Sequence, residues 1–77
     1  MIRLTRSHPA RNMHRFYALQ VTPTLFGEGV LIAEWGRMGC PGTVKQAVFP
    51  SLALAERAMA KRRNAKIRKG YQQHPGS

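Results

Sequence analysis

The sequence predicts an α+β domain: a small antiparallel sheet of three or four strands with one C-terminal α-helix packed on one face. The segments rich in β-branched and aromatic residues are short and are separated by turns that contain Gly or Pro. Their connections are also short, which favours antiparallel pairing. A single long segment near the C-terminus lacks both Gly and Pro and predicts a helix. Residues 1–77 should form one domain, with its core at about 3–71 and a flexible tail at 72–77.

The first predicted strand is short. "IRLT" (2–5) has the composition of an edge strand. "SHPARNMH" (7–14) follows and predicts a loop, because Pro9 and Asn12 punctuate it.

Two stronger strands come next. In "RFYALQVT" (15–22), Tyr17, Leu19 and Val21 alternate onto one face, and Phe16, Ala18 and Gln20 onto the other. "TPTLFGEG" breaks this strand, and "VLIAEWGR" (30–37) forms the next. Here one face carries Leu31, Ala33, Trp35 and Arg37, and the other carries Val30, Ile32 and Glu34.

The last strand and the helix are marked by punctuating residues. "MGCPG" turns the chain into "TVKQAVF" (43–49), and Pro50 ends that strand. Ser51 is the predicted N-cap of a helix over 52–69, although no capping-box partner follows it. Gly70 is the predicted stop just after the helix. The polar end of the chain, "YQQHPGS", is expected to fray.

The predicted helix changes character along its length. Leu52, Ala55 and Met59 form a core-facing stripe at helical spacing. Beyond Met59 cations take over this stripe, so the last turns are expected to outrun the core and project charge. The cations concerned are Arg62, Arg63 and Lys66, with Arg57, Lys61 and Arg68 on the opposite stripe.

The net charge of +10 at pH 7 is the strongest compositional signal, because thirteen Lys and Arg oppose three acids. A compact chain with this imbalance repels itself and usually meets a polyanion. Nine of the cations are Arg, whose planar fork matches phosphate and stacks on flat rings. Composition alone leaves three polyanions open as partners: nucleic acid, whether DNA or RNA, an anionic membrane, or an acidic protein.

Catalysis and metal binding are not expected. Glu28, Glu34 and Glu56 are the only carboxylates, and they fall in a loop, a strand and a helix, so nothing pairs them as acid and base. The scattered histidines and the single Cys40 show no metal-ligand spacing. The sequence therefore predicts no catalytic residue, metal, cofactor or small-molecule substrate.

A membrane partner is not expected either. The N-terminus lacks the apolar run of a signal peptide, and no window approaches ~18 apolar residues. The basic helix lacks the wide apolar face of a membrane-surface helix. A lone cysteine fits a reducing cytoplasm, which is the expected location.

The tripeptide at 35–37 allows two interpretations. Trp35 and Arg37 share a strand face, where an indole and a guanidinium together could hold a flat sugar or base and its phosphate. Spacing alone favours the other interpretation, in which Trp35 belongs to the core, because aromatic residues dominate buried area.

Several segments, in order, resemble the WGR domain, which is named for its Trp-Gly-Arg tripeptide. They are "RFYALQV", "EWGRMGCPG", the strand after it, and a Ser-led helix that ends "KIRKGY". The similarity covers the chain from Leu4 to about Tyr71. This family occurs in DNA-break-activated poly(ADP-ribose) polymerases, in some bacterial regulatory proteins and as short standalone bacterial proteins. It implies an antiparallel sheet with one helix across it.

The resemblance also implies site residues. In the polymerases the Trp and Arg of the tripeptide contact the terminal nucleotide at a DNA break, roles that fall here on Trp35 and Arg37. Gly36 would let the backbone approach closely. Arg15 and the preceding His14 would reach the phosphate backbone. The helix would add non-specific attraction or serve a partner through Arg57, Lys61, Arg62, Arg63, Lys66 and Arg68.

The resulting hypothesis is a non-catalytic bacterial module that binds DNA, preferably ends or nicks, with Trp35 and Arg37 pointing together into solvent. The alternative is a protein–protein interaction module that keeps the fold without recognising DNA ends. The position of the Trp35 ring, sealed under the helix or open on the free sheet face, is the observation that separates them.

Overall fold

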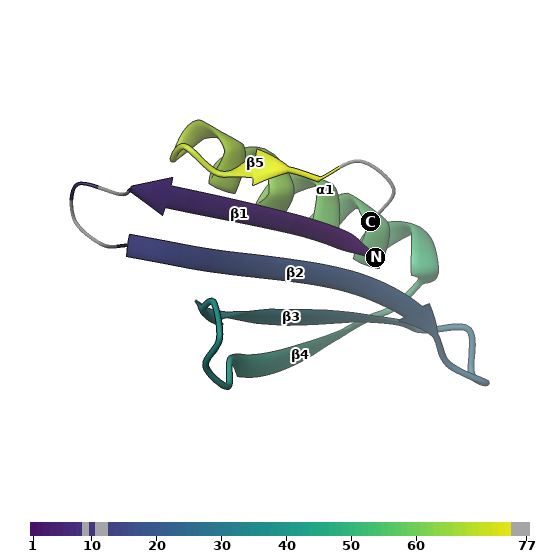
Figure 1. Cartoon of the computed structure of the whole chain (residues 1–77). Helices are drawn as coiled ribbons and strands as arrows, with labels where there is room; N and C mark the ends of the chain where they lie inside the picture. Colours follow the sequence, from purple (N-terminus) through teal and green to yellow (C-terminus); the bar gives the residue numbers. More distant parts are fainter. Residues whose placement is uncertain (9, 11–12, 75–77) are drawn as a thin grey trace.

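The computed structural model describes residues 1–8, 10 and 13–74 and shows a five-stranded antiparallel sheet crossed by one helix (Figure 1). The predicted α+β class is confirmed, with one short strand more than expected. The strands lie in the order β4-β3-β2-β1-β5. The elements are β1 (Ile2–His8), β2 (Met13–Pro23), β3 (Gly29–Arg37), β4 (Thr43–Phe49), α1 (Leu52–Arg68) and β5 (Gln72–Gln73).

The first two strands are longer than the sequence predicted. Ser7 pairs with His14 and His8 pairs with Met13, so much of the predicted loop at 7–14 belongs to the sheet. Alternating polar residues carry too little hydrophobic signal to mark these strand ends, although the partner strand satisfies their backbone groups. Pro9 and Asn12, on which the loop prediction rested, lie outside the described residues.

The C-terminal segment also differs from its prediction. Gln72 and Gln73 pair with Thr5 and Leu4 of β1, and the backbone N–H of His74 donates to the carbonyl of Arg3 at 3.0 Å. The His74 ring also hydrogen-bonds the Thr5 hydroxyl. The expectation of fraying was therefore wrong for residues 72–74, because the open edge of β1 offers them backbone partners.

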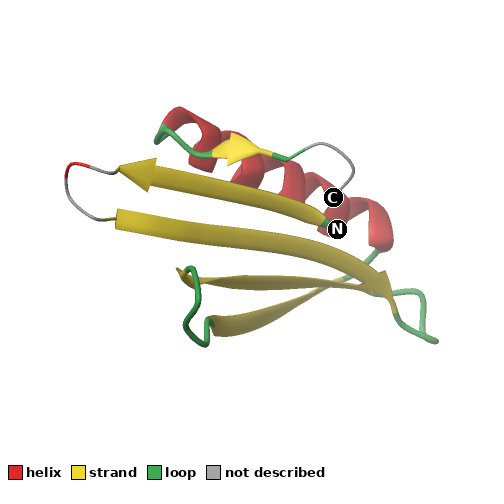
Figure 2. Cartoon of the chain, viewed as in Figure 1, coloured by secondary structure: helices red, strands yellow, loops and turns green. Residues whose placement is uncertain are grey.

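The core lies between the sheet and α1. Leu4, Leu19 and Leu31 are fully buried on the face that α1 covers, and Ala58 and Met59 of α1 pack against them. Gly29 explains how closely the helix start approaches. A Cβ on Gly29 would lie 2.7 Å from the Ala55 Cβ and 2.9 Å from the Ser51 carbonyl oxygen. Figure 2 shows α1 running along one side of the sheet.

The helix begins and ends where the sequence predicted. The Ser51 hydroxyl accepts the Leu54 backbone N–H at 3.2 Å, which is an N-cap bond. Gly70 has a φ of 99° at the C-terminus. The N–H of Gly70 donates to Ile67 and that of Tyr71 donates to Lys66, at 3.0 and 3.1 Å. These two bonds form a Schellman motif, which turns the chain back toward β1.

Candidate nucleic-acid interface

The aromatic centre of the candidate site is a cross-strand pair. Tyr17 of β2 lies directly opposite Trp35 of β3 in the register of the sheet. Their ring centroids are 5.8 Å apart and their planes differ by 16°, so the rings are stacked. Tyr71, just after α1, meets the Tyr17 ring edge-on at 6.4 Å. Stacked and edge-to-face contacts are the favoured arrangements of aromatic rings, so the three side chains support one another.

Trp35 lies on the face that α1 covers, near the end of the sheet. The indole packs against the buried core and is half-buried, so it is neither sealed under the helix nor open on the free face. It lines an open hollow of about 400 Å³. This volume falls within the ~300–1,000 Å³ of small-ligand pockets. The other lining residues are Arg15, Phe16, Tyr17, Gly36, Arg37, Lys66 and Tyr71.

Lys66 brings a cation from α1 into this hollow. Its Nζ lies 4.6 Å from the centroid of the Tyr17 ring and 5.6 Å from that of Tyr71. A cation over an aromatic face is attracted by the ring quadrupole. The sequence predicted that the last helical turns would project their charge away from the core. For Lys66 this was wrong, because the Schellman turn places Tyr71 beside it and the ammonium rests on the aromatic rings.

The surroundings of Lys66 disfavour the charged form of its amine. Burial lowers its pKa below the ordinary 10.5, and the neighbouring positive charges of Lys69 and Arg62 lower it further. An anion in the hollow would oppose all of these effects, since it would favour the charged form of the amine.

A row of arginines crosses the sheet two residues away from the aromatic pair along the strands. Arg6 of β1 pairs with Arg15 of β2, and Arg15 pairs with Arg37 of β3. Strand alternation places all three on the face that carries Tyr17 and Trp35. Like charges directly opposite one another destabilise a sheet. Arg6 also lies beside the end of α1, because its Nε would be 3.5 Å from a Cβ on Gly70.

The acids of the chain lie elsewhere. Glu28 is in the β2–β3 turn, where Thr24 donates to it. Glu34 lines a groove on the opposite face of the sheet, and Glu56 lies in the first half of α1. The hollow is therefore lined by three cations and four aromatic residues, a combination suited to phosphate with a flat or apolar group attached.

Gly36 serves the packing of the β3–β4 turn. A Cβ at this position would lie 3.2 Å from the Gly42 Cα and 3.5 Å from the Phe16 ring. Gly42 is tighter still, with the Phe16 ring at 2.8 Å and the Trp35 carbonyl oxygen at 2.9 Å from a Cβ. Both glycines thus let the turn close over Phe16, which is buried although it points away from α1.

The remaining residues of the expected site are not gathered around Trp35. His14 lies on the opposite face of β2 from Arg15, and its Nδ1 hydrogen-bonds the Ser7 hydroxyl at 3.2 Å. Arg63 is half-buried and donates to the side-chain oxygen of Asn64. The other cations of α1 are exposed and are absent from the lining of the hollow: Arg57, Lys61, Arg62 and Arg68.

In the part of the chain that the structure describes, no three His, Cys, Asp or Glu side chains gather as metal ligands would. The described residues also contain no helix with the length and hydropathy needed to cross a bilayer.

Comparison with known protein families identifies the family of this chain. The sequence model of the WGR domain matches residues 1–77. The protein belongs to the WGR domain family. This family is a non-catalytic, nucleic-acid-binding module, which agrees with the cations and rings around Trp35. The predicted family is thereby confirmed.

One curated relative of this WGR domain is the uncharacterized protein y4dW of Sinorhizobium fredii (strain NBRC 101917 / NGR234). The two are 36% identical over 70 residues, which cover 91% of this chain and 34% of the relative. The WGR domain described here thus spans about a third of that protein. No solved structure matches the chain.

Sequence reasoning did not single out three residues that lie in or beside the candidate site. Tyr17 was assigned only to a strand face, and Tyr71 only to the end of the helix and to the tail that was expected to fray, yet both residues line the hollow. Arg6 was not singled out at all. Register was the missing signal, because pairing β2 with β3 and with β1 puts Tyr17 opposite Trp35 and Arg6 opposite Arg15.

Proposed function

We propose that this WGR domain is a non-catalytic DNA-binding module that prefers ends or nicks. One observation carries the proposal: the half-buried Trp35 ring and the cations Arg15, Arg37 and Lys66 line the same open hollow. Phosphate neutralisation by such cations supplies affinity for any nucleic acid. The aromatic wall adds a contact for the sugar or base that the phosphate carries.

The preference for ends follows from accessibility. Inside an intact duplex each base is stacked between its neighbours, and exposing it requires unstacking and unpairing. A terminal nucleotide already presents a free side. The hollow can therefore take a terminal sugar or base against Trp35 while Arg15 and Arg37 hold the adjoining phosphates. The exposed cations of α1 contribute longer-range attraction that does not depend on a terminus.

The test is a competition between DNA forms. An end-labelled duplex is titrated with the protein at two salt concentrations, with a closed circular duplex as competitor. We expect Trp35→Ala to lose the preference for the labelled end. We expect Arg15→Ala/Arg37→Ala to weaken end binding far more than Arg57→Ala/Lys61→Ala, which removes the same charge from the exposed face of α1.

The rival proposals give different results in the same titration. If the Trp35 and Arg37 variants bind like wild type while the helix variants do not, the tripeptide has only a structural role. Equal competition by RNA would redirect the proposal to RNA. Absence of binding to either nucleic acid at low salt would favour a protein-interaction module.

A further inference from the structure

Arg6 continues the arginine row beyond the hollow. Arg15 and Arg37 line the hollow, whereas Arg6 lies one strand further out, on β1, directly opposite Arg15. Strand alternation places all three side chains on one face of the sheet. Neighbouring strands are ~4.7–4.9 Å apart, so the row spans about 10 Å between its outer Cα atoms. The row therefore includes a guanidinium that the contacts proposed for the hollow do not use.

The end of α1 supports the Arg6 side chain. Arg6 is half-buried, and a Cβ on Gly70 would lie 3.5 Å from its Nε and 3.9 Å from its Cδ. Gly70 belongs to the Schellman turn, whose hydrogen bonds fix the backbone on which this side chain rests. A side chain held in this way loses less freedom when it binds a ligand than a fully exposed arginine does.

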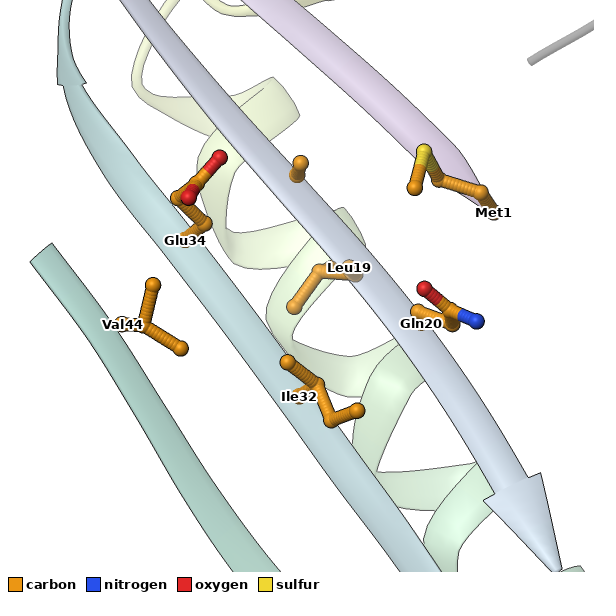
Figure 3. A pocket seen from close by; sticks show the side chains of 7 residues that line it. Met1, Leu19, Gln20, Ile32, Glu34 and Val44 are labelled. Carbon is orange, nitrogen blue, oxygen red and sulfur yellow. The ribbon is translucent and has the colours of Figure 1, made fainter. Parts of the chain in front are cut away.

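The three acids of the chain lie away from this row. Glu28 is in the β2–β3 turn, at the other end of these strands, and Glu56 is in the first half of α1. Glu34 lines a groove on the opposite face of the sheet, and α1 lies behind the strands in this view (Figure 3). The C-terminal end of α1 supplies only about half a negative charge. The row therefore favours an external anion, and phosphate fits the planar fork of arginine.

The register of the sheet gives the row one direction in which it continues from the hollow. Beyond Arg37 the chain enters the β3–β4 turn at 38–42, which carries no charged side chain. The one cation of β4, Lys45, shares the face of the row but pairs with Ala33, ~13 Å back along β3 from Arg37. On the other side, Arg6 stands level with Arg15. A sugar-phosphate strand that leaves the hollow thus meets its next cation on β1.

We propose that Arg6 binds the phosphate next inward from the terminal nucleotide, so that the strand entering the hollow continues across β2 to β1. This proposal rests on the proposed function, because it requires an end held by Arg15 and Arg37. One strand of B-DNA carries a phosphate for every ~3.4 Å of helix axis, so a row of about 10 Å has room for at least two. The site therefore recognises the last linkages of one strand, and a terminal nucleotide alone fills only part of it.

The first measurement is the salt dependence of binding to a labelled hairpin duplex that has one open end, with closed circular DNA as competitor. Arg6→Gln keeps part of the stem, removes the charge and should reduce the slope by about 0.9. From ~50 to ~200 mM salt, wild-type affinity should thus fall about 3.5-fold more than that of the variant. Lys45→Gln is the matched control on the same face and should keep the wild-type slope. Circular dichroism verifies that both variants fold.

The second measurement locates the phosphate. The linkages of the hairpin stem are replaced one at a time by uncharged methylphosphonate, and the replacement that has no further effect in Arg15→Gln marks the phosphate of Arg15. Replacing the next linkage inward on the same strand should weaken wild-type binding but have little effect in Arg6→Gln, because both changes remove one interaction.

Two results separate this proposal from the proposed function. If Arg15→Ala/Arg37→Ala loses end binding while Arg6→Gln keeps the wild-type slope, or if the inward linkage couples to Lys45 instead of Arg6, only the path across β1 is overturned. If Arg15→Ala/Arg37→Ala binds ends like wild type, both proposals are overturned.

Discussion

Trp35 and Tyr17 stack across β2 and β3 with ring centroids 5.8 Å apart, and Tyr17 is buried in the core whereas Trp35 is half-buried. The tripeptide Trp is thus held by a neighbouring ring while it still lines an open hollow. This arrangement combines the two interpretations of Trp35 that the sequence left open. An indole fixed in this way loses little side-chain freedom when a ligand arrives.

The first prediction concerns this stacked pair. Trp35→Ala should weaken binding to DNA ends by about 1–3 kcal/mol, the usual loss when one base-stacking aromatic is removed. Tyr17→Phe keeps the supporting ring and should bind nearly as wild type. Both are measured by fluorescence anisotropy with a short labelled duplex, after circular dichroism has verified folding. A Trp35→Ala protein with unchanged affinity would remove the indole from the interface.

The arginine row predicts a change in salt dependence. The logarithm of the binding constant falls with the logarithm of salt concentration by roughly 0.9 for each phosphate neutralised on B-DNA. Replacing Arg15 and Arg37 by Ala should therefore reduce the slope by about 1.8. Trp35→Ala should leave the slope unchanged, because stacking releases no counterion. Equal slopes for wild type and the double variant would show that these arginines do not contact phosphate.

Lys66 predicts a pH dependence with a definite sign. Its lowered pKa means that the amine loses its proton at a pH below the ordinary 10.5, and with it one charge for the ligand. Affinity should fall as pH rises through this lowered pKa, and bound DNA should raise the pKa again. Lys66→Arg should stay charged and retain its affinity over the same range. NMR titration of the Lys66 side chain with and without DNA measures both shifts; an unshifted amine would contradict the prediction.

Lys66 also affects the stability of the fold. Here the effect of pH is opposite to its effect on DNA affinity, because stability rises with pH. Because the folded protein binds the Lys66 proton less tightly than the unfolded chain does, this group opposes folding at neutral pH. Its unfavourable contribution should diminish as pH rises from the lowered pKa toward 10.5. Lys66→Met should therefore flatten the pH dependence of the free energy of unfolding in that window, as measured by urea denaturation. A matched Lys61→Met change on the exposed face of α1 should not.

The β3–β4 turn predicts the effect of adding one methyl group. Gly42→Ala would place a Cβ 2.8 Å from the Phe16 ring and 2.9 Å from the Trp35 carbonyl oxygen. We expect a loss of about 1–3 kcal/mol in the free energy of unfolding, the usual result of overpacking. In a Phe16→Leu background the ring contact is gone, so the additional loss from Gly42→Ala should shrink. Additive effects in a urea-unfolding double-mutant cycle would rule out this contact as the cause.

Much of the fold could be predicted because local signals agree with one another. The alternation in 15–22 and 30–37 assigned residues to the correct shared faces, and Ser51 and Gly70 marked the ends of α1. β5 escaped prediction because two glutamines carry no periodic signal and pair only because the edge of β1 is open. The extensions of β1 and β2 were missed for a similar reason, since their backbone partners come from the sheet.

The site was predictable only in part. The sequence identified Trp35, Arg37, Arg15 and Lys66, and all four line one hollow. Tyr17 depends on the register of the hairpin, and Tyr71 on the direction that the chain takes after Gly70. Neither follows from alternation within a single strand. His14 shows the converse, because its neighbour Arg15 reaches the hollow and successive side chains of a strand point to opposite faces.

The row formed by Arg6, Arg15 and Arg37 has a consequence for the stability of the protein without DNA. Folding brings three like charges into register and leaves their mutual repulsion in place. DNA phosphates bound between these arginines would cancel that repulsion. The melting temperature should therefore rise as more of the protein binds DNA. Added salt would then have two opposite effects. It would raise the stability of the DNA-free protein by screening the repulsion, and it would lower the affinity for DNA.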